Sequence, residues 1–546
     1  METDSNSAGV HRNLTGWWWT TLAIITWLTA CNSGTANEPP KPIEVSVETT
    51  FITEPIASDG LPDYAGAVLN RLGRDVKPED NGAVILWRAV GVDLLNFQEK
   101  ALLFTELRCD LPRGRDSLKP LPTLRSLGHG ALSDARAGQV FGSRPWRGSD
   151  FPELSEWLEA NQAGLNLLRS VVKCDRYYNP SPSLLSKPPH PLLNTNLCGV
   201  LAMRRAVMCL TVEAACHETV VGTANANVES IRKLAEFSLD DFSAISTLEG
   251  FRYLQAADRL ELLTFQDATD GKDASKVVAM LQARADRPVM WAPQFTLDET
   301  LLMLDTVVRE FSERPTPGKL RPEGDMHRRG DVHELWLEGF FDANQTLRVT
   351  VSYWNRLKEI ASIPDSVARR VAYSNFVEDL RRIDHAALKA KSLQEGHAPA
   401  IANGEVVGAI FVANLFPDAG AVFDAADSTI ARQRLTLLAA ALKLHQLRHG
   451  EYPDALDALA PDPLAEIPLD PFTNEPFVYE RRDEGFAIWS LGRNGVDDGG
   501  SDQSGEFVDG EYAPIDWTGE RPKPNGPDDV VVRLPAPTLE LPGAGR

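Results

Sequence analysis

The segment 427–500 constrains the fold of this chain most, because it predicts a long helix whose apolar surface is too wide to be covered from one side. Over Ser428–His449, leucines recur at helical spacing on one face, with further leucine and alanine side chains close beside them. Gly450 is placed to end the helix, and Tyr452-Pro453 then prevents it from restarting. We therefore expect other elements to cover this helix on more than one side.

A hairpin and an aspartate-rich loop are predicted after this helix and a second short helix at Ala455–Leu459. Two β-prone runs, 477–479 and 486–489, are joined by a charged turn at 481–485, which is a hairpin signature. The second run leads into 494–502, which offers carboxylates, an amide oxygen and glycines. Calcium takes about six to eight oxygen ligands, so this composition fits a calcium site. The alternative is an Asx/Gly turn without a metal ion.

Three motifs in this segment carry a resemblance to a known family. They are His449-Gly450-Glu451-Tyr452-Pro453, Asp470-Pro471-Phe472-Thr473-Asn474 and Ser490-Leu491-Gly492-Arg493-Asn494-Gly495-Val496-Asp497-Asp498-Gly499-Gly500. In this order they resemble the periplasmic part of a type II secretion major pseudopilin. The resemblance covers about the last fifth of the chain. It implies a helix packed on a small antiparallel sheet that is closed by a calcium loop.

The resemblance also implies a set of calcium ligands. Leu491 matches a carbonyl donor, and Asn494 stands where an Asp is usual, which keeps an oxygen ligand but removes a charge. The acids available downstream are Asp497, Asp498 and Asp502. The expected metal residues are therefore Leu491, Asn494, Asp497, Asp498 and Asp502, with the site weakened by the missing charge.

The start of the chain departs from the pseudopilin pattern. A pseudopilin begins with a prepilin peptidase site and a membrane-spanning helix, whereas here an uncharged run, 17–28, leads into Leu28-Thr29-Ala30-Cys31. This resembles a lipoprotein signal peptide over residues 1–31, with Cys31 lipidated; the alternatives are an uncleaved or ordinary signal peptide and a buried helix. We therefore expect an exported protein, membrane-anchored through lipid and facing the periplasm or cell surface. It is not expected to polymerise into a pseudopilus, and it looks similar to exported proteins of planctomycete-type bacteria that end in such a fold.

The remainder of the chain predicts an α+β protein with a large, mainly helical domain. Residues 32–60 read as a linker and lead-in, with a short strand or extended segment at 43–48. Helical patterns cover most of 61–400, interrupted by a loop at 313–331. They fall at 62–72, 83–90, 152–172, 197–221, 230–237, 245–263, 276–284, 297–311, 333–360 and 365–390. The pseudopilin-like domain is assigned to 401–510, followed by an acidic, proline-containing tail or last edge strand at 511–546.

Charge and cysteine content limit the functions that this chain can have. The net charge of −22 argues against a nucleic-acid partner, because phosphate recognition needs clustered Lys and Arg. Besides Cys31 there are five cysteines, an odd number, so at least one thiol is unpaired within a monomer. Several buried thiols are the favoured interpretation, and a Cys174–Cys198 or Cys109–Cys174 bridge is the alternative.

No catalytic motif is recognisable in the sequence. His327, Asp331, His333 and Glu334 lie within eight residues, but the pattern lacks HExxH spacing and fits a polar loop better. His129 between two glycines has no accompanying nucleophile motif, and GxSxG is absent. The favoured hypothesis is a non-enzymatic structural or protein-binding role with an envelope or secretion-associated partner. The alternatives are an exported hydrolase with a site in the helical domain, and ligand capture in an aromatic-lined helical groove.

Overall fold

The fold is known from a computed structural model of the chain. It describes residues 42–114, 117–122, 141–142, 144–266, 269–285, 291–312, 342–393, 408, 412, 419–500, 506–508, 511–513 and 528–537. These residues form a mainly helical body with one small antiparallel sheet near the C-terminus, so the predicted α+β class is confirmed. The signal segment 1–31, the loop 313–331 and most of the run 406–416 lie outside the described residues.

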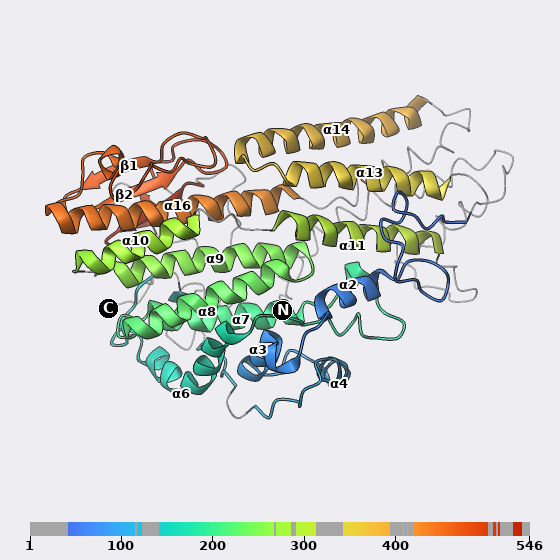
Figure 1. Cartoon of the computed structure of the whole chain (residues 1–546), viewed down its shortest axis with the longest axis horizontal. Coiled ribbons are helices and arrows are strands. Elements are labelled where there is room, and N and C mark those ends of the chain that lie inside the picture. The colour runs from blue at the N-terminus through green and yellow to red at the C-terminus, as the bar shows by residue number, and fades with distance from the viewer. Residues whose placement is uncertain are drawn as a thin grey trace, which may run out of the picture.

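Long helices make up most of the body, and several run along its long axis in stacked rows (Figure 1). In the first half they are α2 (Tyr64–Gly73), α3 (Gly82–Val90), α4 (Phe97–Glu106), α6 (Pro152–Arg169), α7 (Cys198–Ala215) and α8 (Val221–Asp240). They continue with α9 (Ala244–Phe265), α10 (Gly271–Ala285), α11 (Ala292–Ser312), α13 (Ala343–Ala361), α14 (Ser366–Leu393) and α16 (Ala419–His449). Short 3-10 turns lie at Pro78–Asp80, Ser170–Lys173, Leu192–Asn194 and Leu456–Leu459. None of the described helices is long and apolar enough to cross a bilayer.

Three details of the helical body differ from the sequence prediction. The pattern at 197–221 is two helices, because α7 ends at Ala215 and α8 begins at Val221. Helix α4 was not predicted, although Asn96 and Glu99 form a capping box at its start. Residues 43–48 do not form a strand: the chain is irregular to Val45 and then turns at Ser46–Thr50, where the Thr50 hydroxyl donates to the Ser46 carbonyl.

The long helix α16 is covered on two sides, as its wide apolar stripe predicted. It begins at Ala419, earlier than expected, and packs on α9 and α10 on one side and on the sheet on the other (Figure 1). One apolar core joins the end of α9, α10, α16 and the inner face of the sheet. None of the large exposed apolar side chains in the described residues lies on α16. The helix therefore belongs to both the helical body and the C-terminal fold.

The sheet has three strands in the order β1-β2-β5, all antiparallel. The strands β1 (Val478–Arg482) and β2 (Gly485–Ser490) form the predicted hairpin, with a turn shorter than expected. The third strand, β5 (Val530–Leu534), pairs with β2 and lies at the edge of the sheet. It falls in 511–546, for which a flexible tail or a last edge strand was expected; the pairing is that of an edge strand. Two further short strands, β3 (Glu506–Val508) and β4 (Glu511–Ala513), pair with each other.

Candidate metal site

The loop after β2 folds back over the outer face of the sheet. The indole Nε1 of Trp489 donates to Asp497 Oδ1 at 3.0 Å, so the loop is fastened to a ring that would otherwise face outward. Gly492, at φ +61°, lets the chain pass close to the start of β5, because a Cβ there would lie 2.2 Å from the carbonyl oxygen of Asp528. The segments before and after residues 501–527 therefore meet at this loop.

The expected metal ligands lie at or near the same loop. Asn494 Nδ2 donates to Asp498 Oδ2 at 3.0 Å, and Asn494 Oδ1 accepts from the backbone N–H of Val496 at 2.7 Å. Asp497 Oδ1 also accepts from the backbone N–H of Gly499 at 2.9 Å. The structure thus brings Asn494, Asp497 and Asp498 together in one turn. Asp502 lies outside the described residues.

The buried carboxylate of Asp470 fixes the position of Leu491, the expected carbonyl donor. Asp470 accepts from the Leu491 backbone N–H and the Ser490 hydroxyl at 2.9 and 2.8 Å. It also accepts from the backbone N–H of Phe472 at 2.9 Å. Because Asp470 is 1% exposed, these three bonds replace water around its charge. The 470–474 motif is therefore tied to the beginning of the loop.

Two further acids, Asp528 and Asp529, complete the cluster and were not predicted. Asp529 Oδ2 accepts from the backbone N–H groups of Asp498 and Gly500 at 3.2 and 2.9 Å. Asp528 accepts from the backbone N–H of Asn494 at 3.2 Å, and its own N–H donates to Asp498 Oδ2 at 3.3 Å. Two adjacent acids directly before the apolar run Val530–Val532 were the available sequence signal.

The electrostatics of this cluster favour a cation. The pKa of Asp529 is raised to about 7, mainly by burial and also by the neighbouring charges of Asp498 and Asp497. Burial also raises the pKa of Asp528. Asp529 is 1% exposed, and its Oδ1 has no hydrogen-bond partner among the described residues. The nearest counter-charge in the described loop is Arg493, whose Nε lies 3.9 Å from Asp528 Oδ2.

The donor chemistry of the loop fits calcium, because its side chains offer oxygen ligands and the buried Oδ1 of Asp529 accepts no hydrogen bond from the described residues. Within the described residues, however, no three His, Cys, Asp or Glu side chains converge as a ready-made metal cage. Backbone carbonyls, the Asn494 amide and Asp502 would have to complete the coordination. The calcium set therefore stays a prediction, with Asp528 and Asp529 as additional candidates.

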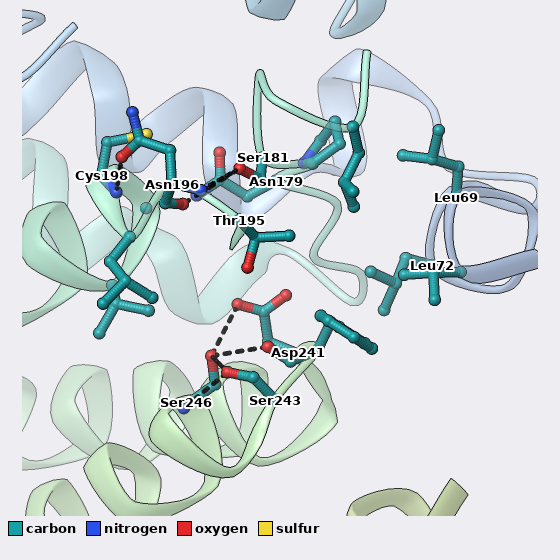
Figure 2. Close-up of a pocket in the computed structure, with 17 residues that line it drawn as sticks. Leu69, Leu72, Asn179, Ser181, Thr195, Asn196, Cys198, Asp241, Ser243 and Ser246 are labelled. Carbon is teal, nitrogen blue, oxygen red and sulfur yellow. Dashed lines mark hydrogen bonds between the residues drawn. The ribbon is translucent and has the colours of Figure 1, made fainter. Parts of the chain in front are cut away.

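A cavity in the helical body offers a second place to look for chemistry. It lies between α2, the start of α7 and the α8–α9 connection. Its volume of about 40 Å³ is large enough for a few water molecules. Figure 2 shows the carboxylate of Asp241 and the hydroxyl of Thr195 facing one another, with Leu69 and Leu72 at another side. Burial raises the pKa of Asp241 to about 6, and its Oδ2 accepts from Ser246 Oγ at 3.3 Å.

This cavity does not contain an activated nucleophile. Its lining has no histidine or lysine, and burial raises the pKa of the Cys198 thiol to about 12, which keeps the thiol protonated. The histidines considered from the sequence, His129, His327 and His333, lie outside the described residues, as do Asp331 and Glu334. The hydrolase alternative thus gains no support from the cavity and remains a prediction. A surface hollow along α4 includes the aromatic side chains of Phe97 and Phe104, and the aromatic-lined groove remains a prediction.

The five cysteines beyond Cys31 are all free thiols. Cys174, Cys198, Cys209 and Cys216 are buried, and Cys109 is partly exposed. The interpretation as buried core thiols is therefore confirmed, and neither of the two alternative bridges forms. Cys209 lies within α7, and Cys216 directly follows the last residue of this helix. The two cysteines are therefore about two helical turns apart along the chain.

One comparison with known proteins gives a match. Residues 420–508 match the family model of type II secretion system protein G. The matched segment begins within α16 and ends at the last residue of β3. The C-terminal part of the chain is therefore a pseudopilin-like domain, as its motifs predicted. Neither the curated proteins nor the solved structures give a match to the chain.

Proposed function

We propose that this protein is a lipid-anchored protein of the bacterial envelope with a structural or protein-binding role near a secretion machinery. The observation that carries this proposal is the protein G match at 420–508, together with the burial of the matched helix in the same chain. A pseudopilin-like domain supports an exported location and a secretion-associated partner. The anchor would be Cys31, and calcium would stabilise the C-terminal loop.

The packing of α16 supports a fixed domain rather than a filament subunit. A helix that assembles with copies of itself needs an apolar face left open for them. Here α9 and α10 cover one side of α16 and β2 and β5 the other, and no large apolar side chain of α16 is exposed. Partner contact through this helix would require the body to open. Among the described residues, the open edge of β1 is the better contact surface, although its charged Glu480, Arg481 and Arg482 oppose indiscriminate strand pairing.

Metabolic labelling tests the lipid anchor. Cells that express the full chain are fed a clickable palmitate analogue, and label on the protein and its membrane fraction are measured for the wild type, Cys31→Ser and Cys109→Ser. Label and membrane association should be lost only in Cys31→Ser. Equal labelling of all three proteins, or none in the wild type, would exclude the anchor.

Thermal unfolding tests the calcium site. The chain without residues 1–31 is heated in calcium and in chelator, beside the triple variant Asn494→Ala/Asp497→Ala/Asp498→Ala. Calcium at a hundred times its Kd should stabilise the wild type by about 2.7 kcal/mol. The triple variant should lose this effect, whereas Asp483→Ala, an exposed acid in the hairpin turn, should keep it. Equal thermal stability of the wild type in calcium and in chelator would show that the loop is an Asx/Gly turn without a metal ion.

A further inference from the structure

Two histidines on the last turn of α16 form a pair outside the loop 491–500 that follows β2. His445 and His449 are four residues apart, so they lie on the same face of the helix one turn from each other. Their ring centroids are 4.1 Å apart and the ring planes are inclined by 30°. His449 is exposed and His445 half-buried, so solvent ions reach both rings. Among the other histidines whose side chains are described, His190 and His217 have no such neighbour.

The hydrogen bonds of the two rings fix which nitrogen carries the proton. His445 Nδ1 lies 3.2 Å from the carbonyl oxygen of Glu451, and His449 Nδ1 lies 3.0 Å from that of His445. A carbonyl oxygen can only accept, so Nδ1 must be the donor in both rings. The neutral rings therefore each carry a lone pair on Nε2. A metal-bound histidine usually has this same arrangement, with its other N–H donated to a carbonyl or carboxylate.

The acidic side chains near the histidine pair form ion pairs with arginines. Arg481 binds Glu451 and Asp454 at 2.8 and 2.6 Å, and Arg448 binds Asp462 at 3.0 Å. No third His, Cys, Asp or Glu joins the pair in the described part of the chain. An ion held here would have two imidazole nitrogens from the protein and water at its other positions.

We propose that His445 and His449 bind a late first-row divalent metal ion through their Nε2 atoms. Imidazole suits Cu²⁺, Ni²⁺ and Zn²⁺, whereas calcium prefers oxygen ligands, so this site and the loop select different ions. Two nitrogens bonded at about 2.0–2.1 Å to one ion stand about 3 Å apart. The ring centroids are 4.1 Å apart, so rotations of the two side chains about their χ angles would bring the Nε2 atoms to this separation.

The site has a structural consequence for the end of α16. His445 donates to the carbonyl of Glu451, beyond the Gly450 that ends the helix. An ion on both rings would hold them in place and thereby fasten the last helical turn to the chain that leads into the hairpin. Affinity should follow Cu²⁺ > Ni²⁺ and Cu²⁺ > Zn²⁺, the order usual for nitrogen ligands.

Titration calorimetry of the full chain with Ni²⁺ and Zn²⁺, in buffer that holds excess calcium, tests this site. Cu²⁺ is followed by electron paramagnetic resonance, in which two coordinated nitrogens give a distinct hyperfine pattern. His445→Ala and His449→Ala should each lower the affinity at least tenfold and remove the two-nitrogen signal, whereas His190→Ala and His217→Ala should not. Unchanged binding in the double His445→Ala/His449→Ala variant would overturn the site.

A second measurement needs no variant. Diethyl pyrocarbonate modifies accessible imidazoles, and mass spectrometry of the digested wild type reports each histidine separately. Zn²⁺ should protect His445 and His449 together and leave His190 and His217 reactive. Equal modification of the pair with and without Zn²⁺ would also overturn the proposal.

Discussion

The guanidinium of Arg369 on α14 donates a hydrogen bond to the carboxylate of Asp427 on α16, and both side chains are almost fully buried. Ser366 Oγ donates to the same carboxylate at 2.6 Å, and Arg370 Nη2 lies 3.2 Å from its other oxygen. Arg370 also donates to the carbonyl of Phe472 at 3.2 Å. Asp427 therefore joins α14, α16 and the 470–474 motif in one polar network.

Removal of Asp427 should destabilise the protein strongly. Asp427→Ala leaves two arginines without their partner, one of them buried, and breaking such a pair typically costs about 3–5 kcal/mol. Urea unfolding followed by circular dichroism measures the change. The control Glu480→Ala removes the exposed pair with Arg482 and should cost less than about 1 kcal/mol. Similar losses in both variants would contradict a special role for the buried network.

Asp529 should make the calcium effect depend on pH. Its pKa of about 7 in the fold, raised by burial, exceeds the value of about 3.9 of an ordinary Asp in the unfolded chain. Between these values the folded state holds a proton that the unfolded state has lost, so the free energy of unfolding falls as pH rises from 4 to 7. Calcium would bind the deprotonated carboxylate, so stabilisation by calcium should grow over the same pH window by about 1–3 kcal/mol.

The variant Asp529→Asn separates the contribution of this carboxyl to the pH dependence of stability from the contributions of other buried carboxyls. Asp298 and Glu299 in the helical body also have pKa values raised by burial to about 7, and they add to the same slope. Thermal unfolding at pH 5 and pH 8, in calcium and in chelator, should show a smaller calcium effect and a flatter slope in Asp529→Asn. Identical profiles in wild type and variant would exclude Asp529 from the site.

Gly485 should tolerate no side chain. A Cβ at this position would lie 1.8 Å from the carbonyl oxygen of Leu534, which is backbone in the pairing of β2 with β5. Gly485→Ala must therefore displace β5, at a cost of at least about 2 kcal/mol. Gly222→Ala in α8 meets nothing within 4 Å and should be neutral or stabilise by up to about 1 kcal/mol. Comparable stabilities of the two variants in urea would argue against this close approach.

The thiols should be almost unreactive in the folded protein. Burial raises the pKa of Cys209 to about 12 and that of Cys216 to about 11, so their thiolate fractions are small. Ellman's reagent at pH 8 should label only Cys109, slowly, in the native chain without residues 1–31. All five thiols should react in urea without a reductant. A lower count in urea would indicate a disulfide.

Local patterns predicted much of this fold. The spacing of leucines located α16, and the two β-prone runs located the hairpin, because both depend on neighbours in the sequence. The same motifs identified the pseudopilin-like domain. Helix α4 was missed because its apolar pattern is weak, although the Asn96–Glu99 capping box marks its start.

Contacts between distant segments were beyond sequence reasoning. Asp528 and Asp529 join the loop only because β5 pairs with β2 and brings residues more than twenty positions away in sequence next to Asp498. Nor does any local pattern identify α9 and α10 as the cover of α16. The buried network of Asp427 likewise depends on where α14 lies, which a single sequence does not reveal.

The shared use of α16 affects the order in which this protein can be assembled during synthesis. Helices α9 and α10 leave the ribosome more than a hundred residues before the helix that covers them. Until Ala419–His449 has been made, side chains such as Phe265, Val278 and Leu281 have no partner from that helix. A nascent chain of this kind carries bare apolar surface for many seconds at usual rates of translation. The growing chain is therefore prone to aggregation until its last quarter has been made.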